Sequence, residues 1–149
     1  QWILWKSLLD YGEYELANEI AEKALNLWEK EVSATYNCYE HFMIENGRGA
    51  GFHQFSGLST PVLMWFESYY MPFSVTSGFR TLITDKKSDG KNLSFNVHTD
   101  STKASVIVCL KEDKDYTFEC DAATIKISKA AYLLNFNASG TFGVNVLEK

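Results

Sequence analysis

Glu40 is the side chain in this sequence whose neighbours best suit a role in catalysis. It lies between Tyr39 and the pair His41 and Phe42, at the start of a polar stretch with three glycines that runs to residue 55. Aromatic rings can pack on the apolar faces of a pyranose while a carboxylate moves a proton, so this combination suits sugar chemistry. The alternative is that Glu40 caps a helix or forms a local salt bridge, because carboxylates mark functional sites only in some proteins.

Two helices are predicted before this stretch. Residues 2–11 are apolar on most sides at helical spacing, which is typical of a buried helix, and Gly12 is placed as a C-terminal stop. Residues 13–33 repeat apolar side chains every three or four positions with charged residues between them, which predicts an amphipathic helix. Glu40 is therefore expected at a junction between helix and loop.

A third helix is predicted after the glycine-rich stretch. Ser59 or Thr60 can cap it, Pro61 suits its first position, and Pro72 ends it. It has almost no polar side, and three such helices cannot cover one another on every face. Exposing several large rings is costly. The β-rich half of the chain, another subunit or a further part of a longer polypeptide is expected to cover them.

From Ser77 onward the hydrophobic period changes from about 3.6 to 2, which predicts short strands separated by turn residues. Seven such segments at this spacing favour an antiparallel sandwich. The predicted class is α+β, with three helices in residues 1–74 and a β-sandwich in residues 75–149. The predicted strands are 79–84, 92–98, 104–110, 116–120, 124–127, 132–136 and 141–147.

Composition excludes several classes of function. The net charge of −5, without a cluster of Lys and Arg, disfavours nucleic acid. The longest apolar run is far shorter than the ~20 residues of a membrane-spanning helix. The histidines and cysteines lack metal-ligand spacing, so neither a metal nor a cofactor is expected. The 10 Phe, 8 Tyr and 4 Trp make a ring-rich chain whose rings must be buried or line a site.

Three segments resemble, in order, the end of the (α/α)6-barrel glycosidases, in particular glycoside hydrolase family 63 and its trehalase-like relatives. They are Tyr-Glu-His-Phe at 39–42, Glu-Asn-Gly at 45–47 and Phe-Ser-Gly-Leu-Ser at 55–59. The likeness covers about residues 1–72. It implies that the three helices are part of an α/α barrel and that the chain is the C-terminal portion of an inverting α-glycoside hydrolase.

The resemblance also implies roles for individual residues. Glu40 matches the general base, and Trp2, Trp5, Tyr39 and Phe55 match residues that shape the sugar site. The substrate would be a carbohydrate. The general acid should be an aspartic acid well upstream in the family, and no residue here occupies that position. The remainder of the barrel would come from the same polypeptide or a partner chain, and the chain would not be active alone.

Two other classes of function stay open. One is a non-catalytic carbohydrate-binding or structural module that has lost the enzyme role, which fits Leu58 at a position where the family usually has tryptophan. The other is an interaction protein whose apolar helices meet a partner chain. For both Trp2 and Trp5, packing in the core is the alternative to a place in the sugar site. The compartment also stays open.

Overall fold

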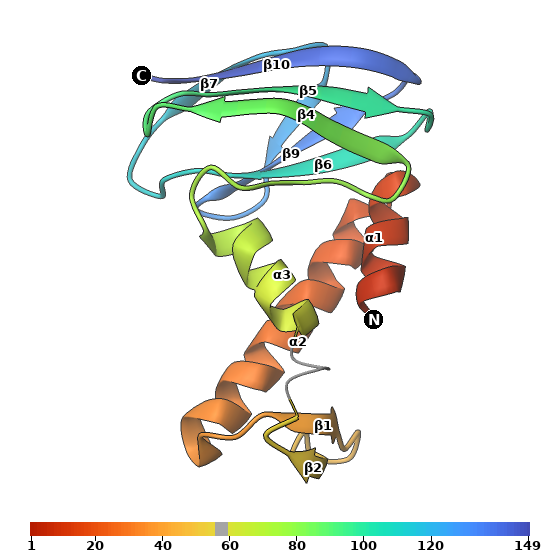
Figure 1. The fold of residues 1–149 in the computed structure, drawn as a ribbon, viewed down its shortest axis with the longest axis vertical. Coiled ribbons are helices and arrows are strands. Elements are labelled where there is room, and N and C mark those ends of the chain that lie inside the picture. The colour runs from red at the N-terminus through yellow and green to blue at the C-terminus, as the bar shows by residue number, and fades with distance from the viewer. Residues whose placement is uncertain (56–59) are drawn as a thin grey trace.

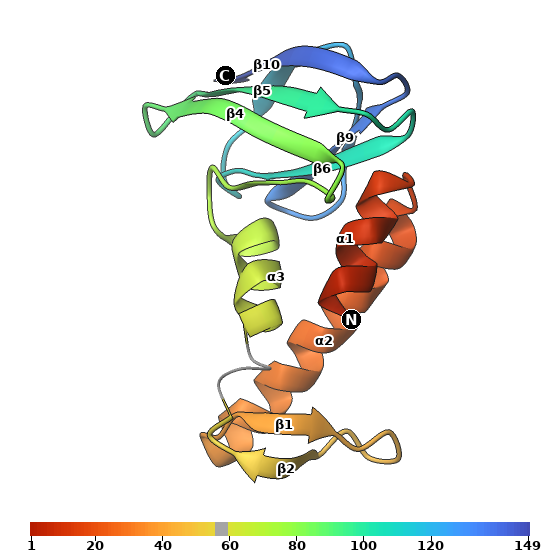
Figure 2. The same cartoon turned by 45° about the vertical axis from the view of Figure 1, so that its right-hand side comes forward.

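The computed structural model describes residues 1–55 and 60–149, and Figures 1 and 2 show it from two sides. The Ser59 cap and Leu58 of the sequence analysis lie outside the described residues. Two stacked four-stranded sheets form one end, three helices lie beneath them, and a small hairpin lies at the far end (Figure 1).

The first two helices form an antiparallel pair. Helix α1 covers Trp2–Asp10 and helix α2 covers Tyr14–Thr35. Gly12 adopts a φ of +74° in the connection, a left-handed conformation that favours glycine. Helix α2 has 22 residues and so spans about 33 Å at 1.5 Å per residue. It therefore extends beyond α1 and carries the hairpin away from the sheets (Figure 2).

The stretch expected as a loop forms a hairpin. Strand β1 covers Tyr39–Phe42 and strand β2 covers Gly49–His53, and the two pair antiparallel. The helix-to-loop junction predicted for Glu40 is therefore wrong, because Glu40 lies inside a strand. Helix α3, Thr60–Tyr70, then leads back toward the sheets.

The eight other strands within the described part of the chain pair antiparallel in two sheets. One sheet has the order β4-β5-β10-β7 and the other β3-β6-β9-β8. The strands are β3 (Val75–Thr76), β4 (Thr81–Ser88), β5 (Leu93–Thr99), β6 (Ala104–Cys109), β7 (Tyr116–Glu119), β8 (Ala123–Lys126), β9 (Ala131–Phe136) and β10 (Gly140–Glu148).

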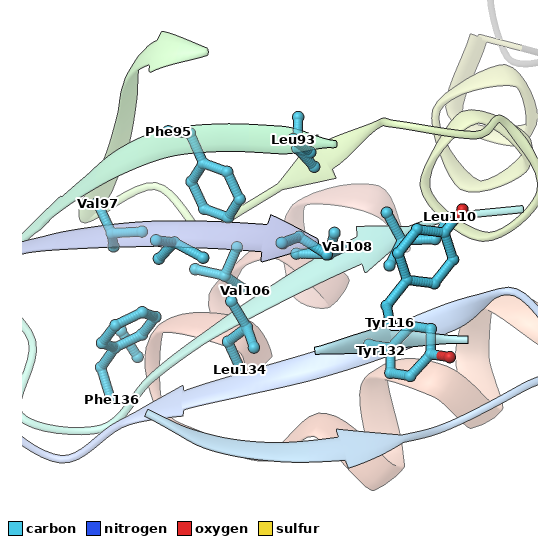
Figure 3. Packing of buried hydrophobic residues seen from close by; sticks show 13 residues of the cluster. Leu93, Phe95, Val97, Val106, Val108, Leu110, Tyr116, Tyr132, Leu134 and Phe136 are labelled. Atoms are coloured by element: carbon cyan, nitrogen blue, oxygen red, sulfur yellow. The ribbon is translucent and has the colours of Figure 1, made fainter. Parts of the chain in front are cut away.

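The space between the two sheets is filled by apolar side chains from both. Phe95 and Val97 on β5 meet Val106 on β6 and Leu134 on β9, all at most 2% exposed (Figure 3). Burying each such side chain contributes roughly 1.5–3 kcal/mol. This is the main core of the sandwich.

A second core lies on the other face of the sheet β3-β6-β9-β8. Ile107 and Leu133 of that sheet are buried together with Trp5 of α1 and Val62 and Trp65 of α3. Strand β6 is consequently buried on both faces and is apolar at nearly every position, as expected for a strand between two layers.

This second core corrects the prediction of a partial α/α barrel. The helices of such a barrel pack on one another around a shared axis, whereas α1 and α3 turn their buried faces to a sheet. The structure is α+β with antiparallel sheets, but its helices do not form part of a barrel. The sheet covers one face of these helices, while Ile3, Leu4, Leu63 and Phe66 remain 48–68% exposed on other faces.

Candidate functional site

The hairpin places Glu40 at an irregular point of its ladder. Tyr39 pairs with His53 and His41 pairs with Ala50, so the single residue Glu40 faces two residues of β2. This is a β-bulge, a feature that often re-aims a side chain beside a functional site. The Phe52 backbone N–H donates a 3.4 Å hydrogen bond to Glu40 Oε2.

Gly51 is one of the two β2 residues that face Glu40, and its conformation favours glycine. Its φ is +80°, and a Cβ built on it would lie 2.7 Å from Glu40 Oε2. A neighbouring position is equally restrictive, because a Cβ on Gly49 would lie 2.1 Å from the Tyr39 ring. Gly49 and Gly51 therefore make room for the side chains of β1.

A cavity of about 520 Å³ lies between the hairpin and the helices and includes Glu40 in its wall. This volume falls within the 300–1,000 Å³ that is usual for small-molecule sites. Helix α1 contributes Trp2, α2 contributes Trp28, the hairpin contributes Tyr39 and α3 contributes Trp65. Glu40 is the only acidic residue in the wall, so the described residues place no second carboxylate beside it.

Three tryptophans of the cavity wall have buried indole nitrogens without a hydrogen-bond acceptor among the described residues. They are Trp2, Trp28 and Trp65. By contrast Trp5 Nε1 donates to the Tyr69 hydroxyl at 3.4 Å, inside the core. Each unsatisfied buried donor costs about 1–3 kcal/mol, so three around one cavity are an unusual concentration.

The structure brings together some of the residues predicted for the sugar site and not others. Glu40, Trp2 and Tyr39 lie in one cavity wall. Trp5 is fully buried in the second core, which is the alternative that the sequence left open for it. Phe55 follows the hairpin, where its backbone N–H donates to the Cys38 carbonyl oxygen at 3.2 Å, and it is not part of the cavity wall.

Sequence reasoning did not select Trp28 or Trp65 for the site. Trp28 follows Ala24 by one helical turn on α2, and both line the cavity. The spacing of Ala24 and Trp28 indicated only an apolar helix face, and a helix that packs in the core has the same spacing. The proximity of Glu40 to that face arises because the chain reverses between α2 and β1, at Tyr36 with a φ of 57°.

No group of three or more His, Cys, Asp or Glu side chains in residues 1–55 and 60–149 could hold a metal ion. Among the described helices, none is long and apolar enough to cross a membrane.

Searches against family models, curated proteins and solved structures find no match for this chain. The resemblance to glycoside hydrolase family 63 therefore rests on the amino-acid sequence alone.

Proposed function

We propose that this chain contributes the general base, Glu40, to an inverting α-glycoside hydrolase whose site is completed by further chain in the same polypeptide or in a partner. The cavity carries the proposal, because it combines one carboxylate with three tryptophans and a tyrosine. The resemblance at residues 39–59 gives the reaction class and the inverting outcome.

In this mechanism the Glu40 carboxylate accepts a proton from a water molecule as its oxygen attacks the anomeric carbon. A second carboxyl group, from outside the described residues, protonates the leaving glycosidic oxygen. Inverting enzymes hold the two groups roughly 6.5–9.5 Å apart so that the water fits between the base and the sugar. Trp2 and Tyr39 would contact the sugar, since aromatic faces pack on its C–H groups.

The bulge would give Glu40 a fixed orientation. The 3.4 Å contact from the Phe52 N–H engages Oε2 and leaves Oε1 to accept the proton from water.

The test is Glu40→Gln in the protein translated from the whole reading frame, assayed on α-linked disaccharides and aryl α-glycosides. Removing a general base should lower kcat by about 10²–10⁴-fold. Glu45→Gln is the matched control, because Glu45 is an exposed acid five residues away and is not part of the cavity wall. An unchanged rate in Glu40→Gln, with wild-type circular dichroism, would refute the assignment.

A non-catalytic carbohydrate-binding module is the second candidate. The observation that favours it is the single carboxylate in the cavity wall, which provides half of a catalytic pair. In that case sugars would quench or shift tryptophan fluorescence in wild type and Glu40→Gln alike, and the whole protein would cleave no glycoside.

A further inference from the structure

We propose that Arg48 and Glu31 form a positioning pair that holds the hairpin, and with it Glu40, in place on helix α2. This inference rests on the proposed function, because it assigns to Arg48 a role in placing the general base. Arg48 is a positioning residue in this proposal, since it is not part of the wall of the Glu40 cavity.

The contact between the two side chains is a two-point contact. Arg48 Nε lies 2.8 Å from Glu31 Oε2 and Arg48 Nη2 lies 3.3 Å from Glu31 Oε1. A guanidinium and a carboxylate joined at both pairs of atoms fix orientation as well as distance. Glu31 lies near the C-terminal end of α2 and its side chain is only 3% exposed.

The burial of Glu31 makes this pair different from the other ion pairs in residues 1–55 and 60–149. A buried carboxylate without a partner is strongly unfavourable, so Glu31 constrains where Arg48 can be. The hydrogen bond from Arg48 keeps the pKa of Glu31 below its ordinary value, against the opposing effect of burial. Among the described residues, this is the only ion pair that joins the hairpin to a helix.

The loop around Arg48 transmits that constraint to the strands. The Arg48 N–H donates to Asn46 Oδ1 at 2.9 Å, the Arg48 carbonyl accepts from the Met43 N–H at 2.9 Å, and the Gly47 N–H donates to the Met43 carbonyl at 2.8 Å. Arg48 therefore lies in a closed turn and immediately precedes β2.

The strand ladder continues from that turn to Glu40. Gly49 pairs with Phe42 and Ala50 pairs with His41, and the next step is the bulge that faces Glu40. A shift of Arg48 would move β2 along this short ladder. A displacement of about 1 Å at a reacting group can cost 10²-fold in rate, so a loose hairpin would impair catalysis without removing the base.

The experiment compares Arg48→Gln and Arg48→Lys in the protein translated from the whole reading frame, with Lys23→Gln as the matched control. Lys23 also forms an ion pair on α2, with Glu19 at 2.5 Å, but both side chains are more than half exposed and distant from the hairpin in sequence. Arg48→Gln should lower kcat by about 10–100-fold with little change in KM, because the cavity wall keeps its residues. Arg48→Lys should show a smaller loss, since lysine keeps the charge but not the two-point geometry.

Hydrogen exchange of the chain gives a second readout that needs no activity. The Phe52 amide, which donates to Glu40, should exchange faster in Arg48→Gln, while amides of β6 and β9 keep their protection. If Arg48→Gln unfolds, the double variant Glu31→Arg, Arg48→Glu, in which the two side chains change places, should restore both amide protection and kcat. If Glu40→Gln abolishes activity but Arg48→Gln keeps the wild-type kcat, the positioning role is refuted and the proposed function is retained. An unaffected Glu40→Gln would instead remove the proposed function itself.

Discussion

The Asp10 carboxylate joins the end of α1 to the loop before β4, and the cost of removing it can be worked out from its contacts. Asp10 is 3% exposed. It accepts hydrogen bonds from the backbone N–H groups of Phe79 at 2.7 Å and Arg80 at 3.0 Å, and its carbonyl accepts from Ser101 Oγ at 2.6 Å. A Cβ on Gly78 would lie 1.9 Å from Asp10 Oδ1, so the loop closes tightly on the carboxylate.

Asp10→Ala removes both side-chain acceptors and leaves two backbone donors without a partner. A hydrogen bond to a charged group contributes about 1.5–3 kcal/mol, so losing two of them should lower the unfolding free energy by about 3–6 kcal/mol. At about 2–4 °C per kcal/mol for a chain of this size, Tm should fall by about 6–24 °C. Asp10→Asn keeps one acceptor and should lose about half as much, roughly 1.5–3 kcal/mol.

The assay is urea unfolding at 25 °C followed by tryptophan fluorescence, with Asp100→Asn as the matched control. Asp100 also binds Arg80, at 2.8 Å, but its side chain is 73% exposed, and such surface pairs contribute about 0–1 kcal/mol. A second check introduces Gly78→Ala into both wild type and the Asp10→Ala variant. It should destabilise wild type more than it destabilises the variant, because the variant lacks the carboxylate with which the new Cβ clashes. If Asp10→Ala loses no more stability than Asp100→Asn, the reasoning about this buried contact is refuted.

Three further predictions concern the hairpin and the core. Gly51→Ala should destabilise the protein by about 1–3 kcal/mol in urea unfolding, because it forces a side chain into a φ of +80° beside the Glu40 carboxylate. Leu134→Ala should cost about 2–5 kcal/mol in the same assay, since Leu134 is fully buried between the sheets. Arg48 lowers the pKa of Glu31 below its ordinary 4.5. The stability that this pair contributes is therefore present above pH 4.5 and is lost as the pH falls through the lowered pKa. The difference in Tm between wild type and Arg48→Gln should accordingly become smaller in acid.

Two of these predictions have a matched control in the same chain, and the third has a refuting outcome. Gly90 has a φ of +84° with nothing within 4 Å of a built Cβ, so Gly90→Ala measures backbone strain alone and should cost less than Gly51→Ala. Leu82 is 63% exposed, and Leu82→Ala should change stability by less than about 0.5 kcal/mol. A difference in Tm that stays constant from neutral pH to acid would contradict the role given to Glu31.

The local elements of this protein were readable from the order of its residues. A period of 3.6 predicted the helices at 2–11 and 13–33 close to the observed Trp2–Asp10 and Tyr14–Thr35, and a period of 2 predicted strands from residue 77 onward. These patterns are local, since one apolar face is enough to set the period. Glu40 could be selected as a candidate because its aromatic neighbours are adjacent in sequence.

What only the tertiary structure decided depends on contacts between distant residues. The family resemblance implied helices that pack in a barrel, but Trp5 and Trp65 pack against Ile107 of a sheet. The Glu31 carboxylate meets Arg48 seventeen positions later, and no periodicity marks such a pair. The local pattern indicates which side of an element is apolar. Which residues pack against that side depends on the free energy of the whole packed chain.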